Sequence, residues 1–511
     1  MPARCTAAAV LLALSASLQP PITRRTHLKR HASIDDAALL DAYRAEIAPE
    51  AADDWWREFV AATERPPRPA VRCVDAAAAA ALRASTACEE IPWAPGRGYW
   101  LNEEPSKRVA HVAGDYYVQE AAAMVAIAAL LRGEDLRRRV VAIDACAAPG
   151  GKTVQLATAL RDAGADAVVV ANEPSSSRLG ALVANAVRCG VGPWLRCTRT
   201  TGQKLFAALP KESADLILLD APCSGDTLAR REGRGLAKHL RAQPDAGSMK
   251  EIVATQLEIV RAAWPCLKEG GALVYATCSL RPREDEEIVR RVLKDFADAT
   301  LEDLAGLATS GAATLRLWPQ THDSAGFFAA KLRKAGDGGG AAVATDADED
   351  VADAARDYLR DAWGVTSLVG PASSRLVGRG ANLWLAPAAP PLAKNLRYER
   401  AGAKLVEALK VRGKAVPLGQ ALRSGRVRAT HEFATTLGGH VDAARRASLD
   451  DASALAYLRG DDVDAAPPSG EPGDQCLVAH GGRVLGLAKV LKGGRLKNQL
   501  PRECVRRDLA F

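Results

Sequence analysis

Short apolar runs and helix-spaced stretches alternate along the middle of the chain. The apolar runs that predict buried strands lie at residues 139–143, 167–171, 216–219, 272–276 and 326–330. The stretches with the apolar spacing of a helix lie at residues 120–131, 154–160, 175–187, 252–264 and 284–293. Such alternation predicts an α/β fold over residues 111–335, with a mostly parallel, doubly wound sheet and helices on both of its faces.

Patterning outside this region predicts smaller units before and after the sheet. Residues 35–110 combine helical spacing with short strand-like runs and predict a small α+β unit. Residues 336–350 are rich in Gly, Ala and Asp and predict a linker. Residues 351–439 have mixed patterning and are predicted only as an intermediate segment. Residues 440–511 show short strands with glycine turns and predict a β-rich terminal domain.

Residues 1–34 differ from the rest of the chain because they contain no acidic residue. An apolar stretch at residues 7–18 precedes a basic cluster that ends at His31. The apolar stretch is typical of a signal peptide, and the basic tail is typical of an organellar transit peptide. We therefore expect a targeting segment and a location in a plastid or mitochondrion. The alternatives are a disordered basic tail and a cytoplasmic protein.

Composition limits the partners and the cysteine chemistry. A net charge of +7, with 48% hydrophobic and 25% charged residues, allows a large core and tolerates a polyanionic partner. The 11 cysteines are scattered without a C-x-x-C pair, which argues against both a structural zinc site and a disulfide framework. No apolar run is long enough to span a membrane.

The first predicted strand of the sheet is followed by a glycine-containing turn that indicates a ligand site. Residues 144–153 read Asp-Ala-Cys-Ala-Ala-Pro-Gly-Gly-Lys-Thr, which is neither the dinucleotide fingerprint nor a P-loop. A glycine pair between strand and helix lets the backbone approach a ligand, and a helix N-terminus attracts a polar or anionic group. The turn therefore predicts a site for a nucleotide-like cofactor. Glu173, just after the second strand, is placed to bind ribose hydroxyls.

Two cysteines follow predicted strands at the same edge of the sheet. Cys223 lies within Asp220-Ala-Pro-Cys-Ser-Gly, and Cys278 lies within Thr-Cys-Ser after the next strand. The carboxyl ends of parallel strands form the ligand edge of such a sheet. A cysteine thiolate is a soft nucleophile that can add to an electron-poor ring carbon. The alternative is a pair of small buried hydrophobes, but two cysteines at corresponding strand ends, beside Asp220, favour a catalytic site.

In this order the motifs resemble those of the Nol/Nop/Sun family of RNA 5-methylcytosine methyltransferases. The resemblance covers residues 55–335. The C-terminal third resembles the bacterial RsmF branch of that family, through Gly486-x-x-Lys followed by Lys497-Asn-x-x-Pro. Together the two resemblances imply a Rossmann-like sheet that binds S-adenosylmethionine, an N-terminal RNA-binding unit at residues 35–110 and a PUA-like RNA-binding domain at residues 440–511.

The resemblance also implies a role for each site residue. Cys278 would be the nucleophile that adds to carbon 6 of cytosine, Cys223 would help to release the RNA, and Asp220 would hydrogen-bond the cytosine ring. The residues that would line the S-adenosylmethionine site are Cys146, Ala147, Ala148, Pro149, Gly150, Gly151, Lys152, Glu173 and Asp220. The resemblance implies no metal.

Two departures from the family pattern concern the same edge. The acid that the family usually carries after the third strand, near the cofactor adenine, is absent around Gly202. The loop at residues 223–227 is one glycine shorter than usual.

We expect an RNA cytosine-5 methyltransferase that acts on small-subunit ribosomal RNA. We expect it to be a monomer and not to associate with a membrane. The alternatives are the same chemistry on transfer RNA, and an RNA-binding ribosome-assembly factor without catalysis.

Overall fold

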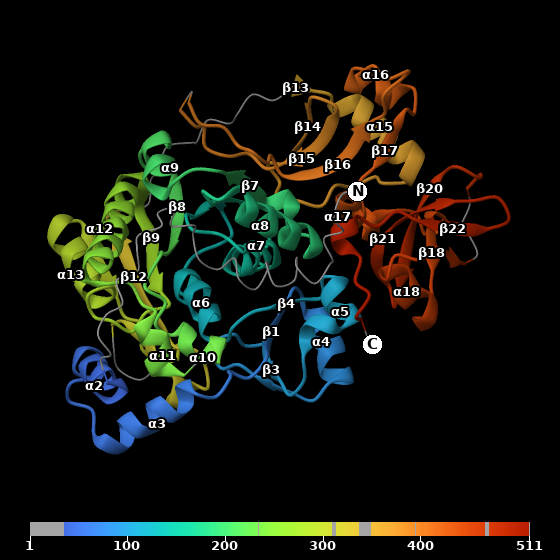
Figure 1. Cartoon of the computed structure of the whole chain (residues 1–511). Coiled ribbons are helices and arrows are strands. Elements are labelled where there is room, and N and C mark those ends of the chain that lie inside the picture. Colours follow the sequence, from blue (N-terminus) through green and yellow to red (C-terminus); the bar gives the residue numbers. More distant parts are fainter. Residues whose placement is uncertain are drawn as a thin grey trace, which may run out of the picture.

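A computed structural model describes residues 35–509, except residues 234, 309–312, 337–348, 394 and 466–469. These residues form four β-sheets with helices packed around them, as Figure 1 shows. The expected targeting segment at residues 1–34 lies outside the described residues, as does most of the expected linker. No helix of the described part is long and apolar enough to cross a membrane.

The central sheet has eight strands and contains the predicted parallel core. Its strands are, from edge to edge, β10 (Ala299–Glu302), β12 (Phe327–Lys334), β9 (Leu267–Thr277), β8 (Ala214–Asp220), β5 (Arg139–Asp144), β6 (Asp166–Asn172) and β7 (Leu195–Thr198), with β11 (Leu315–Leu317) paired to β12. Strands β5 to β9 are parallel, whereas β12 runs antiparallel to β9. The switch from β5 to β6 on one side and to β8 on the other creates the crevice where ligands bind in such sheets.

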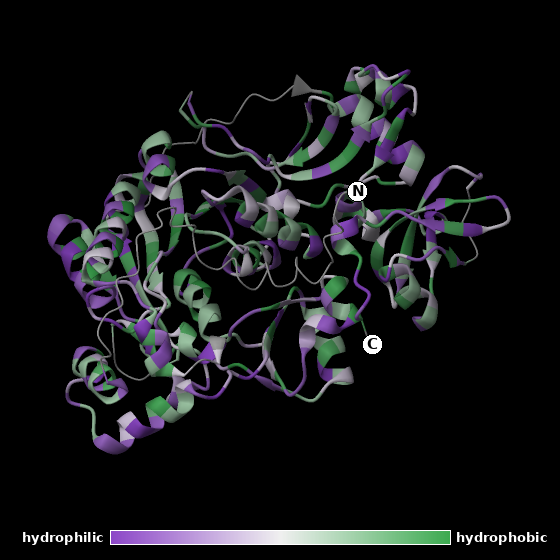
Figure 2. Cartoon of the chain, in the orientation of Figure 1, coloured by the Kyte–Doolittle hydropathy of each residue, from purple (hydrophilic) through white to green (hydrophobic). Residues whose placement is uncertain are grey.

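Helices cover both faces of the central sheet, as expected. One face carries α6 (Val125–Leu131), α7 (Gly151–Asp162) and α8 (Ser176–Arg188), and the other carries α9 (Gly202–Ala208), α12 (Ala246–Ala263) and α13 (Glu286–Asp295). Along β5, Val140 and Ala142 join the first core, whereas Val141 and Ile143 join the second. A strand that is buried on both faces must be apolar at every position, which explains the continuous apolar runs in the sequence. In Figure 2 the central strands are predominantly hydrophobic.

The first sheet is antiparallel and shares a core with the central one. Its order is β2 (Cys88–Glu90), β3 (Gly98–Leu101), β1 (Ala70–Cys73) and β4 (Tyr116–Val118), with α4 (Ala76–Ser85) packed on β1. Because β4 pairs with β1, this sheet continues past residue 110 to Val118. Val71, Tyr99 and Met124 belong to the same continuous core as Val140 of β5. The first sheet therefore packs against the central sheet through a continuous core.

The two N-terminal helices pack away from the first sheet. Helical spacing at residues 35–60 forms two helices, α2 (Asp36–Ile47) and α3 (Asp53–Thr63), because Pro49 cannot continue a helix. Helix α2 packs against α11 (Leu236–Arg241), and α3 packs against α10 (Leu228–Glu232) and α14 (Pro319–His322). This packing places α2 and α3 beside the segments that follow strands β8 and β9, after which Cys223 and Cys278 lie.

The residues after the linker form two further sheets, of which the first was not predicted. The antiparallel sheet comprises β13 (Glu349–Asp350), β14 (Arg375–Arg379), β15 (Asn382–Ala386), β16 (Ala403–Ala408) and β17 (Val427–Ala429), with α15 (Ala352–Trp363), α16 (Leu418–Arg423) and α17 (His431–Leu437). The terminal sheet, in the expected β-rich region, comprises β18 (Arg446–Ser448), β20 (Gln475–His480), β21 (Arg483–Val490), β22 (Arg495–Asn498) and β19 (Val463–Asp464), with α18 (Asp451–Leu458). Leu477 and Leu487 of the terminal sheet belong to the core of the antiparallel sheet, so the two sheets form one body.

Candidate active site

Most of the predicted site residues lie at the carboxyl ends of four neighbouring parallel strands. Asp144 ends β5, Asp220 ends β8, and Thr277 ends β9 immediately before Cys278. Glu173 directly follows β6. The strand order β6-β5-β8-β9 therefore brings these four motifs to one edge, although they are spread over 135 positions of sequence. The structure thus collects the motifs where the sequence predicted, and their chemical roles remain proposals.

The turn between β5 and α7 exposes the backbone at the start of the helix. Gly150 has a φ of +110°, and a Cβ there would lie 3.0 Å from Cδ1 of the buried Leu182. The backbone carbonyls of the turn are already bonded to helix α8: Arg178 donates to the Ala148 carbonyl at 2.9 Å, and Asn185 donates to the Pro149 carbonyl at 3.0 Å. With the carbonyls held away, the first N–H groups of α7 are left to face a polar or anionic ligand.

Lys152 forms an ion pair that joins the β5 and β8 strand ends. Its ammonium nitrogen lies 2.8 Å from Oδ2 of Asp220. Burial lowers the pKa of Lys152, but the attraction of Asp220 outweighs it, so the pKa lies above its ordinary value and the side chain stays charged. The same ammonium lies 5.0 Å from the centre of the Phe327 ring. Lys152 is thus held in place by the protein and fixes the position of the Asp220 carboxylate.

Asp144 is a buried carboxylic acid with an unusual titration. Its side chain is only 1% exposed and accepts a hydrogen bond of 2.6 Å from the Thr153 hydroxyl. Burial is the main cause that raises its pKa to about 7; the Thr153 hydrogen bond and Lys152 act in the opposite direction, and the charge of Asp220 acts in the same direction as burial. Oδ1 of Asp144 has no hydrogen-bond partner among the described residues. A ligand with a hydrogen-bond donor could supply the missing partner of this buried oxygen.

The two cysteines meet in the structure. Sγ of Cys223 lies 3.0 Å from Sγ of Cys278, and both side chains are partly buried. The hydrogen bond to Cys278 is the largest cause that raises the pKa of Cys223 well above its ordinary value, followed by burial and the nearby Glu284. Cys223 therefore keeps its proton, and either thiol can be the donor in the hydrogen bond between the two sulfurs. Two thiols in direct contact at the ligand edge of the sheet are suited to nucleophilic chemistry.

Glu284 ties the two cysteine loops together, and sequence reasoning missed it. Its carboxylate accepts from the Ser224 hydroxyl at 2.5 Å and the Ser224 N–H at 2.8 Å. It also accepts from the Ser279 hydroxyl at 3.0 Å and from Gln256 at 3.1 Å. Glu284 is fully buried, so each of these bonds is shielded from water. The one signal in the sequence was its position six residues after Cys278. It lies in a run of charged residues, which is typical of the solvent-exposed start of a helix.

Asp226 is a second buried carboxylate that joins both loops. It accepts a hydrogen bond from the backbone N–H of Leu280 at 3.2 Å, two residues after Cys278. Tyr43 of helix α2 donates a short hydrogen bond to the same carboxylate. Arg281 lies 3.9 Å from Asp226 and also pairs with Glu46 of α2. The N-terminal helices therefore clamp the loops that carry the cysteines.

Two expectations from the sequence concern the cofactor ribose and adenine. The carboxylate of Glu173 is buried, accepts from the Ser175 N–H at 2.9 Å and lies 3.3 Å from Arg178. Gly202, where an acid was missing, is the first residue of α9, and a Cβ there would lie 3.1 Å from the Ile259 side chain. Thr201 precedes it and caps α9 by accepting from the Lys204 N–H. A threonine hydroxyl thus lies at the start of α9, next to Gly202, and no carboxylate lies at either position.

This edge fits S-adenosylmethionine. The open N–H groups of α7 suit the methionine carboxylate, the unsatisfied Asp144 oxygen suits a donor such as its ammonium, and Glu173 suits the ribose hydroxyls. Bound there, the cofactor would supply an electrophilic methyl group beside the cysteine pair. The residues of the chain that would hold it come from the ends of β5 and β6, which are adjacent strands.

Comparison with known proteins identifies the family. Three family models match the chain in order: the N-terminal domain of 16S rRNA methyltransferase RsmF at residues 41–121, 16S rRNA methyltransferase RsmB/F at residues 133–333, and the methyltransferase RsmF PUA domain at residues 444–506. The solved structure of PH0851 superimposes with a TM-score of 0.51 and 24% identity, over 60% of this chain and 70% of that one. This likeness supports the fold of the central sheet.

The chain is similar to curated bacterial proteins named ribosomal RNA small subunit methyltransferase F. It is 33% identical to the protein of Psychromonas ingrahamii in an alignment of 486 positions that covers 89% of this chain and 94% of that protein. It is 33% identical to the protein of Serratia proteamaculans in an alignment of 499 positions that covers 92% of this chain and 96% of that protein. The prediction of an organellar location is therefore wrong, because these relatives come from bacteria, which have neither plastids nor mitochondria. An acid-free leader is a compositional feature and does not by itself establish import.

These matches confirm the resemblance to the Nol/Nop/Sun family and its RsmF branch, the Rossmann-like fold class and the cofactor. The family models and the curated relatives agree along most of the sequence. The chain belongs to the RsmB/F family of 16S rRNA methyltransferases and uses S-adenosylmethionine as its methyl donor.

Proposed function

We propose that this protein methylates carbon 5 of a cytosine in small-subunit ribosomal RNA through a covalent adduct with Cys278. The observation that carries the proposal is the contact of 3.0 Å between the sulfurs of Cys223 and Cys278, at the sheet edge that holds the cofactor turn. The names of the curated relatives supply the class of RNA. Carbon 5 of cytosine is a poor nucleophile, so a thiolate must first add to carbon 6 to make it reactive.

The residues of the chain have distinct roles in this proposal. Sγ of Cys278 forms a bond to carbon 6 of the cytosine, which must leave its stack to reach the sulfur. Asp220, fixed by Lys152, hydrogen-bonds the ring and stabilises the adduct. After carbon 5 has gained the methyl group from S-adenosylmethionine, its proton passes to water, and the electrons of that C–H bond re-form the double bond between carbons 5 and 6. The bond to Sγ breaks at the same time, and its electrons leave with Cys278 as a thiolate. Cys223, 3.0 Å away, stabilises this leaving sulfur with a hydrogen bond.

All of these side chains come from a single chain, so we propose that the protein acts as a monomer. The clamp of Glu284 and Asp226 would hold the two cysteine loops at a fixed separation while the RNA base enters. Because the loops are held in place before the RNA binds, no free energy is needed to reorganise them when the reaction occurs. We propose that the absence of a carboxylate at Thr201 weakens contacts to the adenine end of the cofactor and leaves the reacting end unchanged.

Bisulfite sequencing of ribosomal and transfer RNA, from cells with and without the protein, tests the substrate. Loss of protection at one cytosine of small-subunit rRNA is expected. Loss at a transfer RNA cytosine would assign the same chemistry to the other RNA. No change in any RNA, together with no methyl transfer from labelled cofactor in vitro, would contradict the proposal and favour an RNA-binding assembly factor.

Two cysteine variants test the mechanism. Cys278→Ala is expected to abolish methyl transfer, whereas Cys223→Ala is expected to trap protein on RNA as an adduct that survives denaturing electrophoresis. Cys504→Ala is the matched control, because Cys504 is also a partly buried free thiol but lies in the terminal domain. Normal turnover by both active-site variants would show that the assigned roles are wrong.

A further inference from the structure

A large cleft separates the antiparallel sheet at residues 349–429 from the terminal sheet. Its volume is about 1090 Å³, and the residues that line it come from α15, α16, β17, β20 and β21 and the loops beside them. None of them comes from residues 35–335, so the cleft is separate from the candidate active site. The volume lies just above the roughly 300–1,000 Å³ that small-molecule sites occupy, which suits a segment of a larger ligand.

The cleft is preformed because its two walls are joined at the base. Gln475 of β20 bonds both backbone groups of Ala429 in β17: it accepts from the N–H at 2.8 Å and donates to the carbonyl at 3.3 Å. The same side chain donates to Gln499 at 2.8 Å. Leu477 and Leu487 pack into the core of the opposite wall. Opening or closing the cleft would break these contacts, so its shape is set before any ligand arrives.

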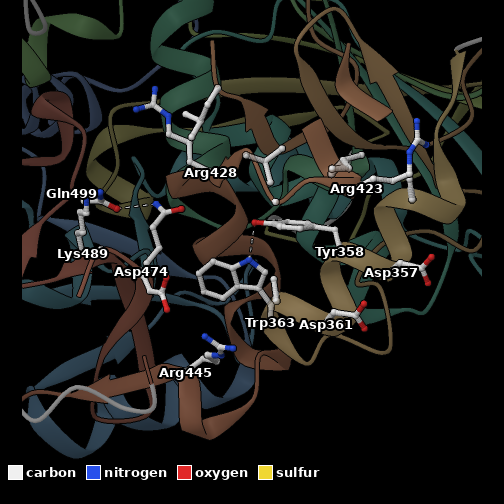
Figure 3. A pocket seen from close by; sticks show the side chains of 18 residues that line it. Asp357, Tyr358, Asp361, Trp363, Arg423, Arg428, Arg445, Asp474, Lys489 and Gln499 are labelled. Carbon is white, nitrogen blue, oxygen red and sulfur yellow. Dashed lines mark hydrogen bonds between the residues drawn. The ribbon is translucent and has the colours of Figure 1, made fainter. Parts of the chain in front are cut away.

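Positive charge converges on the cleft from four elements. Figure 3 shows Arg428 and Arg423 on one side, Arg445 on the other, and Lys489 beside Gln499. Arg423, Arg445 and Lys489 form no ion pair with any described residue, although Arg445 and Lys489 are partly buried. Their charged groups therefore have no counter-charge among the described residues and can pair with an anionic group that arrives from outside.

The acidic residues of the lining do not cancel this charge. Asp357 and Asp361 lie at one side of the cleft and are both bonded to Arg360, at 2.8 and 2.9 Å. Asp474 is the remaining carboxylate of the lining, and it accepts from the backbone N–H of Glu471. Arg428 pairs with Glu407, which does not line the cleft, at 3.2 Å. The excess positive charge of the lining is therefore carried by Arg423, Arg445 and Lys489, with Asp474 as the one carboxylate near them.

Apolar and amide groups lie among the cations. The Tyr358 side chain lies in the middle of the cleft, where its hydroxyl accepts from the Trp363 indole at 3.2 Å, and Leu409 is 43% exposed at the wall. A ring and an alkyl side chain can pack against an unstacked base, amides can bond base edges, and arginines can hold phosphates. This combination fits single-stranded RNA. A double helix presents phosphates and hydroxyls to a protein instead of base faces.

We propose that this cleft binds a single-stranded segment of the ribosomal RNA, away from the cytosine that reacts, and so contributes to the choice of substrate. This inference rests on the proposed function and adds a second RNA contact to it. Phosphates would lie along Arg423, Arg428, Arg445 and Lys489, and one base would pack against Tyr358 and Leu409.

The test uses the full chain with the charge-reversing pair Arg423→Glu and Arg445→Glu. Binding to a small-subunit rRNA transcript is measured by fluorescence anisotropy at several salt concentrations. We expect the double variant to bind about tenfold or more weakly, and the slope of log affinity against log salt to fall by about 1.5, as two lost phosphate contacts predict. In methyl transfer, KM for RNA should rise while kcat is retained.

Arg356→Glu is the matched control, because Arg356 lies on α15, is 60% exposed, pairs with Asp353 alone among the described residues and does not line the cleft. Photo-crosslinking of labelled RNA gives an independent readout, since a nucleotide should attach to the peptide that contains Tyr358. Affinity and salt slope equal to those of the control, without a crosslink there, would overturn the cleft proposal. Methyl transfer by the wild-type protein is measured in the same assay, so failure of the proposed function would be seen separately.

Discussion

Tyr43 and Asp226 are 183 positions apart in the sequence, yet the tyrosine hydroxyl donates a hydrogen bond to the buried aspartate. Asp226 also accepts from the backbone of Leu280, so the bond from Tyr43 supports both loops of the cysteine pair. Burial, and then the charge of Asp226, raises the pKa of Tyr43 well above its ordinary value. The phenol therefore remains a donor across the pH range in which the protein is folded.

Removal of this donor should affect catalysis as well as stability. Tyr43→Phe removes the hydroxyl donor to Oδ2 of the buried Asp226 and leaves that oxygen only the bond from the Leu280 N–H at 3.3 Å, which should destabilise the fold by about 1–3 kcal/mol. Because the cysteine loops lose a common support, kcat for methyl transfer should also fall. Tyr457→Phe is the control, since its buried hydroxyl donates to the Leu487 carbonyl in the terminal domain. If Tyr43→Phe and Tyr457→Phe had the same melting temperature and both kept the wild-type kcat, a positioning role for Tyr43 would be contradicted.

The Lys152–Asp220 pair should act as one unit. Lys152→Met frees the Asp220 carboxylate, and Asp220→Asn removes the charge that Lys152 holds. Each variant should lower kcat/KM by roughly 10²-fold or more, and the double variant should lose little beyond the larger single effect. The double-mutant cycle on kcat/KM measures this coupling. Strictly multiplicative effects would show that Lys152 does not act through Asp220.

Gly150 should tolerate no side chain. Gly150→Ala combines a φ of +110° with a contact of 3.0 Å to Leu182, so it should cost about 1–3 kcal/mol of stability and weaken cofactor binding. Gly164→Ala at the other end of α7 is the control, because Gly164 also has a positive φ, of +68°, but its Cβ would meet no atom within 4 Å. Calorimetric titration with S-adenosylmethionine should show weaker binding only for the first variant. Equal affinities would contradict a role of the turn shape in binding.

Asp144 should make stability depend on pH in a predictable direction. Its pKa rises from 3.8 to about 7 on folding, so the folded state binds the proton more tightly than the unfolded state. The stabilisation is complete below about pH 4 and is lost as the pH rises through about 7, by at most about 4 kcal/mol over that window. Asp144→Asn should flatten this part of the profile, because the amide cannot titrate.

Urea denaturation at several pH values, compared between the wild-type protein and the Asn variant, measures the difference. The Thr153 bond should survive, since an amide oxygen can accept from the hydroxyl. A wild-type profile parallel to that of the variant between pH 4 and 7 would show that Asp144 is charged throughout.

Local patterns in the sequence were sufficient to predict the central sheet and the order of its motifs. A strand buried on both faces is apolar along its whole length, and a strand–turn–helix places its glycines next to the residues that they serve. Parallel strands all end at one edge, so Asp220, Cys223 and Cys278 could be assigned to a common site without knowing the distances. Resemblance to the family added the roles.

Only the tertiary structure decided which distant groups satisfy the buried polar atoms. Glu284 and Tyr43 read as ordinary members of helix-like stretches, and their bonds to Ser224 and Asp226 depend on how whole elements pack. The antiparallel sheet after the linker was not predicted because its strands are short and carry mixed patterns, and the cleft beside it arises from two walls that meet through Gln475. Periodicity records which face of an element is buried, whereas the partner across that face is set by the fold.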